Sequence, residues 1–354
     1  MRIIFLATYP QKITPAQRFR FEHYLPFLLE NNIKYSYKTF LSEKHYKILY
    51  TKNNTIKKIL IILFGFIKRT LLLGEIWKYD FIYIQREISI VGPPIFEWIF
   101  CKIFRKKIIY DFDDAIWVSM SSNANPNADK FKCTWKVKKI CKWSYITTVG
   151  NSFLGQYASQ FCKDVRIIET VVDTQKTHNK TKNQNDIPLT IGWTGTFTNF
   201  IHLPLVLPAI KKLQNEFNLI FLIIAEKNPD LNDIEYVFKK WNLETEIEDL
   251  LLMNIGIMPL IKTDVQLGKC AFKAIQYMSL GIPAVVSPVG ANCEVVQNKI
   301  TGYWADNNAE WYNTLKLLIT DELQRKNMGM LSQKVISDKY SVNATKNLFL
   351  DLFS

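Results

Sequence analysis

Residues 268–288 have the sequence GKCAFKAIQYMSLGIPAVVSP, and this segment carries the clearest structural signal in the chain. Good helix-forming residues run from Ala271 to Ser279, and Gly281 follows where many helices end in a left-handed residue. Ala284–Ser287 then has the apolar, β-branched composition of a buried strand. A helix that leads directly into a buried strand is the repeating unit of a parallel α/β sheet.

The same alternation continues on both sides of this segment. In the second half of the chain, we predict strands at Leu189–Trp193, Leu219–Ala225 and Ile255–Met258, with a helix at Leu203–Phe217. In the first half, we predict strands at Arg2–Ala7, Asp80–Gln85, Lys107–Tyr110, Tyr145–Val149 and Val165–Ile168, with helices at Pro15–Glu30, Pro94–Phe104 and Asp129–Lys142. Strands and helices at this spacing indicate parallel sheets. We therefore expect an α/β protein with two doubly wound, Rossmann-like domains and a cleft between them.

A very polar segment separates the two series. Residues 174–186, TQKTHNKTKNQND, contain almost no apolar side chain, which is typical of a linker or a surface loop. We therefore expect an amino-terminal domain of residues 1–173, a linker of residues 174–187 and a second domain of residues 188–335.

The composition fits two folded domains. The 354 residues are 48% hydrophobic and 22% charged, and a domain has about 150 residues. The net charge of +13 favours an anionic partner, which could be a nucleic acid, a membrane surface or a phosphate-bearing small molecule. The six cysteines and four histidines lack the spacing of metal ligands, so we expect no metal, and scattered thiols are typical of a reducing cytoplasm.

Residues 56–73, IKKILIILFGFIKRTLLL, form the only stretch with the composition of a membrane segment. Its uncharged centre, between Lys58 and Lys68, is about half of the ~20 residues that a spanning helix needs. Two interpretations stay open. The segment is either a buried helix of the core or a basic amphipathic helix on an anionic membrane, and the cations on both sides slightly favour the second.

Lys269 and Lys273 stand four residues apart at the start of the helix in the opening segment. This spacing places both ammonium groups on one face, close to the positive end of the helix dipole. Together they could bind a diphosphate. A solvated basic face is the ordinary alternative, but the neighbouring residues are apolar or small.

A second candidate site is the turn TGTFTN, residues 194–199, between a strand and a helix. Backbone N–H groups in such a turn, together with the helix amino terminus, can bind a phosphate. A glycine in this position is more often only part of a turn.

The third candidate is the acidic turn Asp111-Phe112-Asp113-Asp114, which follows a predicted strand at the edge where parallel sheets bind ligands. Three carboxylates could bind a metal, supply a nucleophile and an acid, or position an acceptor. Helix capping by one aspartate would explain one of the three carboxylates.

Several of these segments together resemble a known family. The run NIGIMPL, the segment GKCAFKAIQYMSLGIPAVVSPVGANCEVV and TGYW are similar to the donor-binding region of family 4 (group 1) retaining glycosyltransferases. The pieces QRFRFEHYLPFL, IQRE, YDFDDAIW and IIETVVD resemble the branch found in bacterial surface-polysaccharide clusters. The resemblance covers residues 1 to about 335 and implies a GT-B fold, with the donor in the second domain, the acceptor in the first, and residues 336–354 returning to the first domain as a helix.

The resemblance also implies roles for individual residues. The expected donor-binding residues are Gly195, Thr196, Gly268, Lys269, Cys270, Ala271, Phe272, Lys273 and Gln276, and the expected acceptor-binding residues are Arg18, Arg20 and Arg86. The expected catalytic residues are Lys269, Lys273, Asp113 and Asp114. The family commonly has two glutamates, eight positions apart, where this chain has Gly268 and Gln276, so the family pattern leaves the donor sugar open.

We therefore expect a retaining hexosyl- or N-acetylhexosaminyl-type transferase that uses a nucleotide-sugar substrate and needs no metal or other cofactor. Its expected acceptor is a saccharide or a lipid-linked molecule, and its expected place is the cytoplasm, peripheral on the inner face of the cell membrane. No motif for nucleic acid is recognised. The alternatives are a non-catalytic module that binds nucleotide sugars and a metal-dependent phosphohydrolase that uses Asp111–Asp114.

Overall fold

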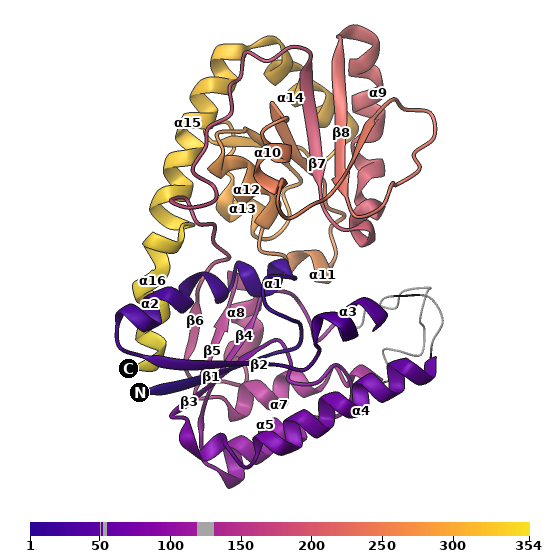
Figure 1. The fold of residues 1–354 in the computed structure, drawn as a ribbon. Coiled ribbons are helices and arrows are strands. Elements are labelled where there is room, and N and C mark those ends of the chain that lie inside the picture. The colour runs from indigo at the N-terminus through magenta and orange to yellow at the C-terminus, as the bar shows by residue number, and fades with distance from the viewer. Residues whose placement is uncertain (50, 52–54, 119–130) are drawn as a thin grey trace. The chain divides into compact units, whose positions relative to one another are not determined.

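The computed structural model describes residues 1–49, 51, 55–118 and 131–354. The chain divides into two compact units (Figure 1). The first contains residues 1–170 and 346–354, and the second contains residues 171–345. Within the described ranges, every helix is too short or too polar to cross a membrane.

The first unit is built on a parallel six-stranded sheet. Its strands, in sheet order, are β2 (Lys34–Thr39), β1 (Arg2–Ala7), β3 (Phe81–Gln85), β4 (Lys107–Phe112), β5 (Ile146–Val149) and β6 (Val165–Ile167). The described α-helices are α1 (Pro15–Arg18), α2 (Leu25–Glu30), α3 (Glu43–Leu49), α4 (Thr55–Leu72), α5 (Ile95–Trp98), α7 (Lys136–Trp143) and α8 (Ser152–Ser159).

Two helices of this unit differ from the prediction. The single helix expected at 15–30 is broken into α1, a 3₁₀ turn and α2, because Pro26 has no N–H to continue a helix through this segment. The helix expected at 129–142 is described only from its later part, as α7, and its first two residues lie outside the described residues.

The second unit has the same architecture. Its parallel strands, in sheet order, are β12 (Gly302–Trp304), β11 (Ala284–Val286), β10 (Ile255–Met258), β7 (Leu189–Thr194), β8 (Leu219–Ala225) and β9 (Val237–Lys240). Its helices are α9 (Leu207–Glu216), α10 (Glu246–Leu250), α11 (Asp264–Leu267), α12 (Phe272–Ser279), α13 (Asn292–Val295), α14 (Asn308–Thr320), α15 (Glu322–Lys339) and α16 (Val342–Leu350), and α16 continues into the first unit. The predicted α/β fold with two Rossmann-like domains is confirmed.

Side-chain alternation explains how helices cover both faces of the second sheet. On β10, Ile255 and Ile257 belong to the apolar core that α9 and α14 share. Gly256 lies between them and faces the other side, where a Cβ would stand 2.4 Å from the ring of Tyr277 on α12. The small residue therefore lets α12 approach the sheet closely.

Tyr277 also connects the two central strands. Its hydroxyl accepts the N–H of Thr194 at 3.0 Å and lies 3.4 Å from the carbonyl of Ile257. The chain runs outward from β7 to β9 and then returns to β10 on the other side of β7. The strand order therefore reverses between β7 and β10, which is where open α/β sheets bind ligands.

The carboxyl terminus returns to the first unit, as residues 346–354 belong to it. There the ring of Phe349 stacks on Tyr24 at 4.3 Å, and Phe353 packs against Phe81. The boundary expected at residue 336 falls inside α15, which continues to Lys339. α16 begins at Val342, so the break between the two helices lies at Tyr340 and Ser341.

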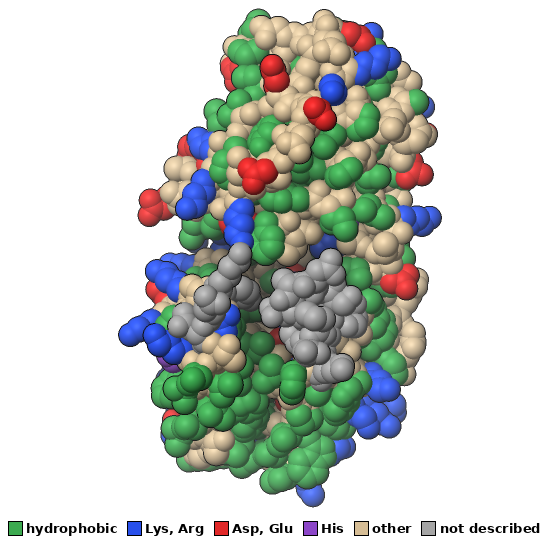
Figure 2. Space-filling view, turned by 90° about the vertical axis from the view of Figure 1, so that its right-hand side faces the viewer, with side chains coloured by type: hydrophobic (Ala, Val, Ile, Leu, Met, Phe, Trp, Pro, Cys, Tyr) green, Lys and Arg blue, Asp and Glu red, His purple; other side chains and the backbone are tan. Residues whose placement is uncertain are grey.

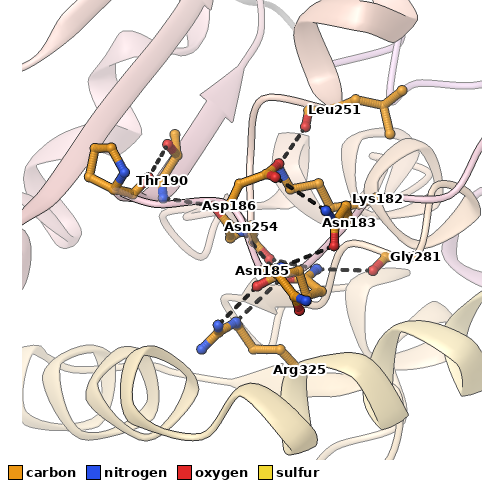
Figure 3. A network of polar contacts seen from close by, with 11 residues as sticks. Lys182, Asn183, Asn185, Asp186, Thr190, Leu251, Asn254, Gly281 and Arg325 are labelled. Carbon is orange, nitrogen blue, oxygen red and sulfur yellow. Dashed lines mark hydrogen bonds and ion pairs between the residues drawn. The ribbon is translucent and has the colours of Figure 1, made fainter.

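The polar segment 174–187 is part of the second unit rather than a detached linker (Figure 3). Gln184 is buried, and its amide nitrogen donates to the carbonyls of Asn254 and Gly281. Buried Lys182 donates to the carbonyl of Leu251 at 2.8 Å. Arg325 of α15 donates to the side chain and the carbonyl of Gln184. Lys182 and Gln184 can be buried in this otherwise mostly exposed segment because their side chains satisfy backbone carbonyls of other elements.

We predict that Gln184→Ala lowers the free energy of unfolding by about 1–3 kcal/mol, because it leaves buried partners on Asn254 and Arg325 unsatisfied. Chemical denaturation followed by circular dichroism measures this difference. Asn185→Ala is the matched control, since Asn185 is exposed in the same segment. Equal stability of the two variants would contradict the assigned role.

Candidate active site

The candidate donor site lies at the carboxyl edge of the second sheet, where β7 and β10 are neighbours. After β7 come Gly195 and a 3₁₀ helix, Phe197–Leu205. After β10 come α11 and the loop that leads to Lys269 and α12. The sheet order therefore brings together the two segments that the sequence marked as phosphate sites.

Gly195 is required for close packing. A Cβ at this position would stand 2.7 Å from Cε of Lys273 and 2.8 Å from the ring of Trp193. The N–H of Gly195 donates to the carbonyl of Ile224 at 3.1 Å, so it is already used within the sheet. The glycine makes room for the lysine, and because its N–H is used, a phosphate contact through that group stays a prediction.

Lys273 lies in this space with its ammonium over the indole ring of Trp193, 5.0 Å from the ring centre. Burial, followed by the like charge of Lys269, lowers the pKa of Lys273 to about 7. The ammonium group is thus poorly solvated and lies near a second cation. An anion placed beside both lysines would relieve this repulsion and favour the charged form.

His202 belongs to the same cluster, although the sequence gave no reason to select it. The imidazole is buried, and Nδ1 accepts the N–H of Ile261 at 3.2 Å. Nε2 lies 3.4 Å from the side-chain amide of Gln266 on α11. Burial, followed by the charges of Lys273 and Lys269, lowers the pKa of His202 to about 4. The ring is therefore neutral at pH 7 and carries its proton on Nε2.

The other predicted donor residues lie in the loop before α12 and in the first part of that helix. Gly268, Cys270 and Ala271 are buried, and Ala271 has a φ of +52°, a left-handed conformation that turns the chain into the helix. Phe272 is half-buried, and Gln276 is only 4% exposed.

Thr196, which follows Gly195, is exposed, and its hydroxyl lies 2.9 Å from that of Thr198. The side-chain amide of Asn199 donates to the same Thr196 hydroxyl at 2.7 Å.

In the first unit, Arg86 follows β3, and hydrogen bonds of its backbone N–H and carbonyl fix its position. Its φ is +58°, its N–H donates to the carbonyl of Asp111 at 2.7 Å, and its carbonyl accepts the hydroxyl of Tyr110. Its Nε donates to Asp113 at 2.6 Å, and Nη2 is 3.8 Å from Asp114. Burial lowers the pKa of Arg86, but the two carboxylates outweigh it and raise that pKa above its ordinary value.

Asp111 and Arg20 form a separate, buried ion pair. β4 continues to Phe112, so Asp111 is a strand residue that points into the unit. Its carboxylate is 2.5 Å from Nη2 of Arg20 and accepts the hydroxyl of Thr148 at 2.8 Å. Arg20 also donates to the carbonyl of Ile168. We therefore assign Arg20 a structural role in place of the expected acceptor-binding role.

The acidic turn therefore does not present three carboxylates at one point. Asp111 is paired with Arg20 inside the unit, whereas Asp113 is paired with Arg86. Among the described residues, no group of three His, Cys, Asp or Glu side chains could hold a metal ion. This arrangement gives no support to the phosphohydrolase alternative.

Two neighbours of Arg20 complete the description of this end of the sheet. Arg18 is half-buried, with its guanidinium 4.5 Å from the ring centre of Phe19. Gln17 is fully buried, and its amide exchanges hydrogen bonds with the backbone of Tyr9, at 3.0 Å in each direction. Sequence reasoning did not select Gln17, because a single glutamine near a helix start carries no distinguishing pattern.

Comparisons with known proteins agree with this architecture. The fold is similar to that of sucrose-phosphate synthase (tll1590) from Thermosynechococcus elongatus, with a TM-score of 0.70, 11% identity, and coverage of 100% of this chain and 98% of that one. HepE (Alr3699) of Anabaena, in complex with UDP and glucose, has a TM-score of 0.69, 12% identity and coverage of 99% and 98%. The catalytic domain of starch synthase IV from Arabidopsis thaliana, bound to ADP and acarbose, has a TM-score of 0.68, 9% identity and coverage of 100% and 98%.

No curated protein matches the sequence. Residues 188–321 match the family of glycosyl transferases group 1. This range contains β7, β10, α12 and every residue of the donor cluster described above. The second unit thus carries a domain that matches the group 1 glycosyl transferases, and the chain as a whole has the GT-B fold.

Proposed function

We propose that this protein transfers a sugar from a nucleotide-diphosphate sugar to an acceptor, with retention of configuration. One observation carries the proposal: Lys273 lies poorly solvated over Trp193, beside the turn at Gly195, at the ligand-binding edge of the domain that matches group 1 glycosyl transferases. The structurally similar HepE and starch synthase IV were solved with UDP and ADP, respectively. A diphosphate carries the negative charge that two adjacent lysines would bind.

The proposed chemistry follows from where charge develops. When the bond between the sugar and the diphosphate breaks, negative charge grows on the leaving diphosphate. Lys273 and Lys269, with the amino terminus of α12, would stabilise that charge. Because the lysines are already in place, little reorganisation is needed during the reaction. Removing one such group commonly lowers the rate by about 10²–10³-fold.

His202 adds a neutral donor to this proposed site. Its Nε2–H lies near Gln266 and close enough to both lysines to feel their charge. A neutral imidazole adds no further repulsion between cations. Gln276, at the place where the family commonly has glutamate, offers an uncharged amide for the ribose. We propose a hexosyl or N-acetylhexosaminyl donor, with no metal or other cofactor.

The side chains that we propose to orient the acceptor substrate lie in the first unit. Nε of Arg86 donates a 2.6 Å hydrogen bond to Asp113, and Asp114 lies beside the same guanidinium. Asp113 or Asp114 would orient the acceptor hydroxyl. We propose a saccharide or a lipid-linked acceptor and a role in surface-polysaccharide assembly on the cytoplasmic side of the membrane. Proton NMR of the product, at its new anomeric carbon, separates retention from inversion.

We predict that one nucleoside diphosphate of a panel (UDP, GDP, ADP) raises the melting temperature without added metal, because it binds only the native state. Lys269→Ala/Lys273→Ala should abolish that rise. Lys211→Ala/Lys334→Ala is the control, since both lysines are exposed on other helices of the same unit. A rise that the double variant retains would contradict the site. A nucleotide that binds while no acceptor is glycosylated would favour the non-catalytic module.

The lowered pKa of Lys273 gives a second prediction. The diphosphate binds the charged form, so affinity should be highest below pH 7 and should fall as the pH rises above about 7. Between pH 7.5 and 9.5 the phosphates stay fully ionised, because their last pKa is about 6. Calorimetric titration should therefore show proton uptake on binding. Lys273→Arg should give an affinity that does not change over this range, and a wild-type affinity that is equally constant would refute the prediction.

A further inference from the structure

Helix α4 has two different faces, one buried against the first unit and one exposed and apolar. Its inner stripe consists of Ile61, Gly65, Arg69 and Leu72, which are buried at intervals of four, four and three residues. Gly65 allows the closest approach, because a Cβ there would be 2.4 Å from the ring of Phe40. This stripe packs against the first unit.

Buried Arg69 fixes the helix in this position. Its guanidinium donates to the carbonyls of Ala7 at 2.9 Å, Lys38 at 3.2 Å and Ile88 at 3.2 Å. These carbonyls come from the ends of β1 and β2 and from the segment after β3. Lys68 adds a bond to the carbonyl of Thr39 at 2.7 Å. The orientation of α4 is therefore determined by the sheet beneath it.

The opposite face of the helix is exposed and apolar. We call it the outer stripe, and its members are Ile56, Ile59, Leu60, Leu63, Phe64, Ile67 and Leu71. Each of these side chains is 49–76% exposed, and the spacing of three and four residues places them on one side. No charged residue interrupts the stripe between Lys58 and Lys68. A continuous apolar surface of this length on a folded unit indicates an interaction site.

Two exposed tryptophans stand on neighbouring segments. Trp77 follows the end of α4 and is 65% exposed, and Trp98 on α5 is 45% exposed. α5 is tied to α4 by the stacked rings of Phe66 and Phe96, 6.2 Å apart. Tryptophan is enriched where protein meets the boundary between lipid and water.

The surroundings of the outer stripe are strongly basic. Residues 34–107 contain fifteen Lys and Arg against five Asp and Glu, which is +10 of the chain's +13. Lys44, Lys47 and Lys57 are exposed on α3 and on the first turn of α4. Figure 2 shows hydrophobic side chains gathered on the first unit, with Lys and Arg at the margins.

We propose that the outer stripe binds the surface of an anionic lipid bilayer, with α4 lying in the headgroup region parallel to the membrane. At 18 residues the helix is about 27 Å long, and its apolar side would enter the acyl boundary while the lysines contact lipid phosphates. A second copy of the chain is a poorer occupant, because it would bring two strongly basic regions together. The proposal deepens the membrane location proposed above and holds whether or not the chain transfers sugar.

Co-sedimentation of the full chain with vesicles tests the proposal. We expect binding to vesicles of phosphatidylcholine with phosphatidylglycerol, weaker binding to phosphatidylcholine alone, and a decrease at high salt. Ile59→Ser/Leu63→Ser/Ile67→Ser should lower the partition coefficient on the order of 100-fold, from lost apolar burial. Leu323→Ser/Met330→Ser/Leu331→Ser, three exposed residues of α15, is the matched control and should bind like wild type.

Three results would overturn the proposal. In the first, the wild-type protein stays in the supernatant with anionic vesicles. In the second, the outer-stripe variant sediments like the control. In the third, the protein is a dimer without vesicles, and the serine substitutions dissociate it. Melting curves with nucleoside diphosphate are recorded on the same samples. A folded variant that leaves the vesicles but keeps its nucleotide response separates membrane binding from the donor site, so either proposal can fail alone.

Discussion

The candidate donor site depends on the close packing of α12 against the second sheet, which positions Lys273. Lys273 lies over Trp193 because Gly195 has no side chain to exclude it. α12 can bring the lysine there because Gly256 admits the ring of Tyr277, whose hydroxyl binds Thr194 at the end of the neighbouring strand. Two glycines and one tyrosine thus set the distance between helix and sheet. That distance, in turn, determines how poorly the ammonium is solvated.

The candidate residues of the two units lie in different charge environments. In the first, guanidinium groups are matched by carboxylates, as in Arg20 with Asp111 and Arg86 with Asp113. Such pairs fix the ends of strands and turns, and removing one partner leaves a buried charge uncompensated. At the candidate donor site of the second, two like charges lie close together, and burial together with the charge of Lys269 lowers the pKa of Lys273. The first arrangement stabilises a scaffold, whereas the second creates a demand for an anion.

The sequence predicted the interior strands well, because a buried parallel strand is a continuous apolar run. It did not predict β2, β9 and β12, which lie at the edges of the sheets. Two of these strands, β2 and β9, contain many polar residues and therefore lack the continuous apolar run of an interior strand. The four-residue spacing predicted that Lys269 and Lys273 lie close together, and the charge of Lys269 does affect Lys273. The hydrogen bond from the Gly195 N–H to Ile224 has no sequence signal. Gln184 and His202 were missed for the same reason: burial of a single polar residue depends on partners far away in the chain.

A direct titration of Lys273 tests the central claim. Protein labelled with ¹³C at the lysine ε-carbons, compared with Lys273→Arg for assignment, reports the protonation of this group by NMR. We expect a pKa near 7 in the unliganded protein and a clear upward shift with the nucleoside diphosphate that binds. A Lys273 that titrates near the ordinary lysine value of about 10.4, and does not respond to any nucleotide, would contradict the account.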